Sequence, residues 1–119
     1  MTKKEYLESV LKSNIDDSKV GKVESLYGRK MPDIIRRIVS NNDEAEFFDD
    51  GIRFLSLNEI LDAETDLHIN FSALGMIPIA DCGENDFIVY HFKDHTWSKF
   101  NIIDETVFKK KADLLELLK

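Results

Sequence analysis

Three apolar runs in the C-terminal half of the chain are separated only by short polar turns. The runs span residues 76–80, 87–92 and 97–103 and are rich in aromatic and β-branched residues, which favour strands. The turns, 81–86 and 93–96, carry Asp, Asn, Gly and Thr, which favour reversal of the backbone. Connections this short join antiparallel neighbours. The pattern therefore predicts an antiparallel β-meander.

The central run indicates how that sheet is covered. In a strand successive side chains point to opposite faces, so Phe87 and Val89 lie on one face while Ile88, Tyr90 and Phe92 lie on the other. Both faces are apolar. We therefore expect at least part of the sheet to be covered on both sides.

The first third of the chain predicts three amphipathic helices. Thr2 and Glu5 have the spacing of a capping box, and Ser18 is placed to cap the second helix. Gly28 suits the left-handed residue that ends a helix, and Pro32 suits the first turn of the next helix. The helices are expected over residues 2–12, 18–27 and 32–41.

The middle of the chain predicts a hairpin and a short helix. Asp50 and Gly51 favour a tight turn between two short apolar runs, 47–48 and 52–55. Ser56 begins a second capping box and a helix of about two turns, and residues 66–75 are expected to be extended or loop. Residues 104–118 carry Val107, Phe108 and four leucines, from which we expect one long C-terminal helix.

Together these elements predict an α+β domain in which the meander packs with N-terminal helices and one C-terminal helix. The 119 residues suffice for one hydrophobic core, so we expect a single domain over 1–119. The sequence contains no long apolar run that would span a membrane or direct secretion. A lone cysteine, Cys82, favours a reducing compartment, so the expected location is the cytoplasm.

The negative charge is concentrated in the middle of the chain. Residues 41–92 hold twelve acidic side chains and one base, Arg53, in a chain of net charge −7. Such a field repels phosphate backbones, so we expect no direct binding to nucleic acid. It attracts basic surfaces, which makes a basic protein partner the favoured class.

One part of this acidic segment is a candidate docking surface. Five acids fall within eight positions, and Phe47 among them is a candidate apolar anchor. A solvated acidic face is the simpler alternative. The candidate partner-binding residues, with two acids of the following segment as an extension, are Asp43, Glu44, Glu46, Phe47, Asp49, Asp50, Glu64 and Asp66.

The sequence offers only weak catalytic or metal-binding candidates. His91 and His95 are four residues apart, with Asp94 and Cys82 nearby, but they fall in a strand and the following turn and not on one helix face. No catalytic residue, metal or cofactor is expected. A small hydrolase using Asp81, His91 or His95 is the least favoured alternative.

The order of several short motifs resembles the SUKH superfamily, which includes bacterial immunity proteins and a fungal cell-wall regulator domain. The resemblance covers most of the chain, through residues 27–32, 51–56, 76–81 and 87–92 and Trp97. The chain is short for this family, and Ser40-Asn41-Asn42 stands where the family often has an asparagine-glycine pair.

The resemblance implies a non-catalytic α+β domain that binds and neutralises a bacterial toxin, commonly a nuclease. The expected function is therefore that of an immunity protein whose partner is a cognate toxin, with a basic nuclease as the candidate class. A regulatory or scaffold module that binds a cellular protein with the same surface is the alternative.

Overall fold

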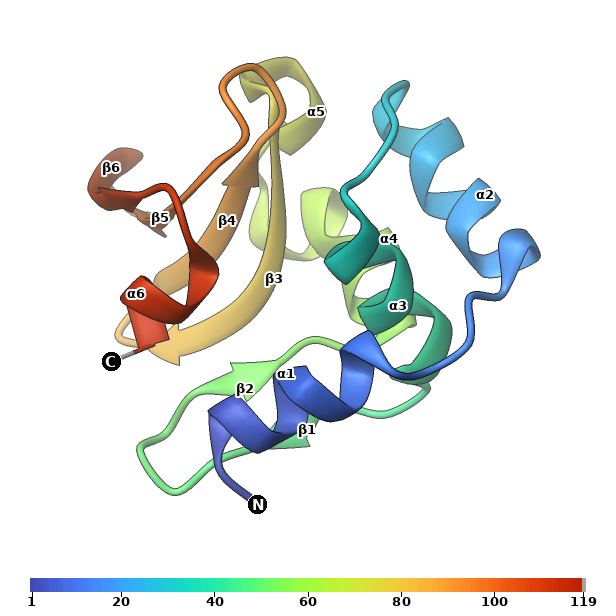
Figure 1. The fold of residues 1–119 in the computed structure, drawn as a ribbon. Coiled ribbons are helices and arrows are strands. Elements are labelled where there is room, and N and C mark those ends of the chain that lie inside the picture. Colours follow the sequence, from blue (N-terminus) through green and yellow to red (C-terminus); the bar gives the residue numbers. More distant parts are fainter. Residues whose placement is uncertain (119) are drawn as a thin grey trace.

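A computed structural model describes residues 1–118 as an α+β fold (Figure 1). The helices lie at Lys3–Leu11 (α1), Asp17–Tyr27 (α2), Asp33–Asn41 (α3), Leu57–Leu67 (α4), Phe71–Leu74 (α5) and Leu114–Leu118 (α6). The strands lie at Glu46–Phe47 (β1), Arg53–Phe54 (β2), Met76–Gly83 (β3), Asp86–His91 (β4), Thr96–Asn101 (β5) and Thr106–Lys111 (β6).

The strands form one sheet in the order β1-β2-β3-β4-β5-β6, and every neighbouring pair is antiparallel. The predicted meander is thus confirmed. Phe87, Ile88, Val89 and Tyr90 are buried in succession along β4, so both faces of the sheet are covered there, as expected. Across the β4–β5 ladder Tyr90 lies opposite Trp97, with ring centroids 4.8 Å apart.

The helices cover the sheet from two places. Helices α1 and α2 pack against α3, and α2 also packs against α4. Helices α4 and α5 pack against β3, whereas α6 packs against β5 and β6. Figure 1 shows α1 to α4 gathered beside β3, with α6 near the last strands. Buried residues from every layer join one hydrophobic core, which includes Val23, Ile38, Phe54 and Ile88.

Several local predictions are confirmed, and two are corrected. Capping boxes start α1 at Thr2 and α4 at Ser56, and Gly28 ends α2 in the left-handed conformation at φ 67°. The cap of α2 is Asp16 and not Ser18, because the Asp16 carboxylate accepts bonds from the backbone amides of Ser18 and Lys19. Pro32 is the residue before α3 and not part of its first turn.

The prediction of one long C-terminal helix over 104–118 is wrong. Residues 106–111 form the edge strand β6, which pairs with β5, and only the last turn and a half is helical. The side-chain oxygen of Asn101 accepts bonds from the backbone amides of Ile103 and Asp104, at 2.9 and 3.2 Å. This side chain closes a turn that sends the chain back along β5, where Val107 and Phe108 suit a strand.

The segment after Ser56 is also more helical than predicted. Helix α4 has 11 residues, and α5 occupies part of a segment expected to be extended or loop. The carboxylate of Glu64 accepts hydrogen bonds from the amide and hydroxyl of Ser72, both at 3.0 Å. The side chain of Asn70 caps α5 at Ala73. These contacts are made by polar side chains, and the periodicity of apolar residues does not reveal them.

Candidate functional site

The tip of the β1–β2 hairpin presents two of the predicted acids to solvent. Asp49 and Asp50 lie in the turn, and the carboxylate of Asp50 accepts a bond from the backbone amide of Ile52 at 3.1 Å. Asp50 also forms an ion pair with Lys3 at the start of α1. The hairpin tip is therefore acidic, but part of its charge is balanced within the molecule.

The two phenylalanines of the hairpin have different surroundings. Phe47 is 73% exposed, and the Arg53 guanidinium lies 5.9 Å from its ring centroid. Phe48 turns inward, with its ring 5.5 Å from that of Tyr6 and 5.9 Å from that of Phe54. Phe47 is thus available to a partner, while Phe48 helps to attach the hairpin to the core.

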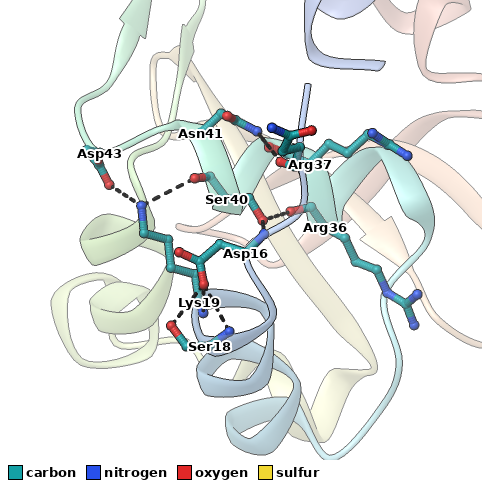
Figure 2. A network of polar contacts seen from close by, with 9 residues as sticks. Asp16, Ser18, Lys19, Arg36, Arg37, Ser40, Asn41 and Asp43 are labelled. Carbon is teal, nitrogen blue, oxygen red and sulfur yellow. Dashed lines mark hydrogen bonds and ion pairs between the residues drawn. The ribbon is translucent and has the colours of Figure 1, made fainter. Parts of the chain in front are cut away.

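Asp43 belongs to a polar network that joins α2 to the end of α3 (Figure 2). The Lys19 ammonium donates to the Asp43 carboxylate at 2.8 Å and to the Ser40 carbonyl at 3.3 Å. The Ser40 hydroxyl accepts from the Asp16 amide at 2.8 Å and donates to the Arg36 carbonyl at 2.7 Å. The bond to Asp43 raises the pKa of Lys19. Asp43 is therefore a neutralised, structural member of the predicted acidic cluster.

The structure does not bring the remaining predicted acids into one patch. Glu44 is exposed, and Glu46 is half-buried on β1 opposite Phe54. Glu64 and Asp66 lie toward the end of α4 next to α5, where Glu64 bonds to Ser72. Of the eight candidates, Asp49, Asp50 and Phe47 are those that the hairpin carries outward together.

A hollow of about 620 Å³ lies between the start of α1, the hairpin tip and α6. Phe48, Leu115 and Leu118 give it apolar walls, and charged side chains surround them. The charged residues that line it are Asp49, Asp50, Asp113, Glu116, Lys3 and Lys4. Four acids from two distant parts of the sequence therefore surround one partly apolar hollow, which we call the acidic groove.

The sequence did not predict two of the four acids that line the acidic groove, Asp113 and Glu116. Asp113 and Glu116 fell inside the predicted long helix and carried no signal of their own. In the structure the Asp113 carboxylate accepts a bond from the Leu115 amide at 3.0 Å, at the start of α6. An Asp immediately before a leucine-rich segment is a typical helix start, so this signal could have placed the boundary. Leu115, in the first turn of α6, is 37% exposed and lines the groove.

The histidines occupy two separate environments. His91 Nε2 lies 2.6 Å from the Ser98 hydroxyl, and burial lowers the pKa of His91. His95 Nδ1 lies 2.7 Å from the Tyr90 hydroxyl. Residues 1–118 contain no group of three or more His, Cys, Asp or Glu side chains arranged to hold a metal ion.

The other residues considered for catalysis are also committed elsewhere. Asp81 accepts a bond from Arg53 at 3.3 Å and another from the Gly83 amide at 2.8 Å. Burial raises the pKa of Cys82, which keeps its thiol protonated and weakly nucleophilic. The residues of the hydrolase alternative, Asp81, His91 and His95, thus each bond to a different partner.

Comparison of the chain with models of protein families, with curated proteins and with solved structures finds no match in any of the three. Its relation to the SUKH superfamily therefore stays a prediction. Within residues 1–118, no helix combines the length and apolar character needed to cross a membrane.

Proposed function

We propose that the protein is an immunity-type inhibitor that binds a basic protein toxin directly and covers the toxin's active site or substrate channel. The acidic groove is the proposed contact surface. The observation that carries the proposal is that Asp49 and Asp50 line the same hollow as Asp113 and Glu116, beside apolar walls.

The composition of the groove defines the partner that it fits. Among residues 1–118, Asp50 forms an ion pair with Lys3, whereas the carboxylates of Asp49 and Asp113, which also line the groove, form none. The local field therefore favours a segment that carries Lys or Arg, and such fields speed encounter and disfavour acidic partners. Leu115 adds exposed apolar surface within the groove, which supplies the affinity that surface charges alone do not.

Binding is preferred to catalysis for a physical reason. The Ser98 hydroxyl and the His91 imidazole have the separation of a nucleophile and its base, but Ser98 is fully buried. A substrate would have to open the sheet to reach that hydroxyl. The pair is better explained as a hydrogen bond that satisfies two polar groups under the surface.

The test is co-expression with the product of the gene encoded next to this one. If that product is the toxin, the protein restores growth of the toxic strain and forms a purified complex with it. The proposal fails if the neighbouring product is harmless or if no complex forms between the purified proteins. A variant with Asp49→Arg and Asp113→Arg should lose the complex, while Asp62→Arg with Glu84→Arg, on exposed acids outside the groove, should retain it.

A further inference from the structure

A second hollow, of about 500 Å³, is formed by four segments outside the acidic groove. Arg29 follows α2, Gly75 ends α5, Lys93 lies in the turn between β4 and β5, and Lys110 lies on β6. This volume is in the range of small-molecule sites in proteins. On a protein of net charge −7, three cations meet here, so we call it the basic hollow.

One cation of the basic hollow is already neutralised. The Lys110 ammonium donates to the Asp94 carboxylate, which also accepts a bond from the Thr96 hydroxyl at 2.7 Å. The bond from Lys110 holds the pKa of Asp94 well below its usual range. Asp94 is therefore ionised and committed to Lys110 and Thr96. Among residues 1–118, neither Arg29 nor Lys93 forms an ion pair with an acid.

Two neighbours, Phe92 and Gly75, contact the guanidinium of Arg29, and neither contact uses its N–H donors. Its guanidinium carbon lies 5.5 Å from the ring centroid of Phe92, a cation–π contact. Gly75 adopts φ +72°, and a Cβ there would stand 3.1 Å from Arg29 Nη1. The guanidinium thus lies close to the Gly75 backbone, and any side chain at position 75 would push it away slightly. A planar group held in this way can offer paired N–H donors to an oxyanion.

Apolar surface lies beside these cations. Leu74 is 49% exposed and lines the basic hollow together with Ala73 and the largely buried Phe92. A ligand that carried only charge would leave this surface in contact with water. A ligand with an anionic head and an apolar body would cover it and gain the corresponding hydrophobic free energy.

We propose that the basic hollow binds a small molecule that carries a carboxylate or phosphate group on an apolar body. Arg29 and Lys93 contact the oxyanion, and Leu74 and Phe92 contact the apolar part. This site is separate from the acidic groove, so it does not depend on the proposed toxin partner.

The test is a titration of the ¹⁵N-labelled protein with inorganic phosphate, phenyl phosphate and benzoate at constant ionic strength, with sodium chloride as the reference. Saturable shifts of the Gly75 and Lys93 amides are expected with phenyl phosphate, benzoate or both. The aryl ligand that binds identifies the anionic group. Inorganic phosphate should bind more weakly than phenyl phosphate, and equal binding of the two would overturn the apolar contact. The absence of a saturable shift with any of the three overturns the site.

Charge variants distinguish binding at the basic hollow from a general effect of the protein's charge on the anion. Arg29→Gln should weaken binding at least about tenfold, the loss of one charged hydrogen-bonding partner. Lys93→Gln should weaken it less, since an ammonium offers no planar pair of donors. Lys30→Gln removes an exposed charge that does not line the hollow and should leave binding unchanged. Equal effects of Arg29→Gln and Lys30→Gln would contradict the assignment. Arg29 is exposed, so thermal unfolding should show all three variants folded.

Discussion

The Tyr6 hydroxyl donates a hydrogen bond to the side-chain oxygen of Asn42, 2.9 Å away, inside the protein. The Asn42 amide donates to the Leu55 carbonyl at 3.3 Å, and the Asn42 carbonyl accepts from the Leu57 amide at 2.8 Å. One buried asparagine therefore joins α1, the end of α3 and the start of α4. This is a structural role for the segment 40–42, in which the chain departs from the family it resembles.

Replacing either partner of this bond should destabilise the fold. Tyr6→Phe leaves the Asn42 oxygen without its donor and should lower the free energy of unfolding by about 1–2 kcal/mol. Asn42→Ala removes bonds to two elements and should cost more, about 2–4 kcal/mol. Urea unfolding of both variants and of the double variant measures their coupling. Strictly additive effects would show that the two side chains act independently.

The same substitution at Tyr27 should have the opposite effect on the free energy of unfolding. The Tyr27 hydroxyl is buried and has no hydrogen-bond partner among residues 1–118. Burying an unpaired hydroxyl costs free energy, so Tyr27→Phe should raise the free energy of unfolding by up to about 1–2 kcal/mol. Urea unfolding of Tyr27→Phe beside Tyr6→Phe gives the comparison. A loss of stability equal to that of Tyr6→Phe would mean that the hydroxyl has a partner after all.

The burial of Tyr6 also predicts sensitivity to alkali. Burial raises the pKa of Tyr6 from its ordinary value near 10 to about 12. Between these values the unfolded chain has lost the Tyr6 proton and the folded protein has kept it, so stability falls as pH rises from about 10 to 12. The loss attributable to Tyr6 is at most about 2–3 kcal/mol. Tyr6→Phe should lose less stability over this interval than the wild type, and equal losses in urea titrations at pH 9 to 12 would refute this.

The sequence predicted those elements whose signal is local. Capping boxes at Thr2 and Ser56, the glycine at 28 and the Asp-Gly turn all depend on side chains within four residues, and the structure confirms each of them. The meander followed from the shortness of its turns. These features need no knowledge of the rest of the fold.

The two largest failures, at β6 and the acidic groove, occurred where distant partners decide the structure. Val107 and Phe108 suit a helix face as well as a strand, and only pairing with β5 distinguishes the two. The same error concealed the acidic groove, because Asp113 approaches Asp49 only when the chain turns back at Asn101. Charge counting located the hairpin acids but could not show that Lys19 neutralises Asp43.

Substitutions at two leucines of α6 should have different effects on stability and on binding. Leu117 is 6% exposed, so Leu117→Ala should lower the free energy of unfolding by about 2–5 kcal/mol. Leu115 is 37% exposed in the acidic groove, so Leu115→Ala should cost less than about 1 kcal/mol in stability. It should nevertheless weaken the toxin complex by about 1–2 kcal/mol. Calorimetric titration together with urea unfolding checks both quantities. Unchanged affinity in Leu115→Ala would remove α6 from the interface.

Neutralising the acids of the groove should change the rate and the salt dependence of binding. Asp49→Asn with Asp113→Asn removes two rim charges and keeps the side-chain oxygen that caps α6. Since rim charges act mainly on encounter, the association rate should fall by about 3–10-fold and vary less with salt. The dissociation rate should change little.

Asp62→Asn with Glu84→Gln removes the same charge from exposed positions outside the groove and should have a smaller effect on association. Stopped-flow measurements over a range of salt concentrations compare the two pairs. If both pairs slow association equally, the partner responds to the net charge of the protein and not to the acidic groove.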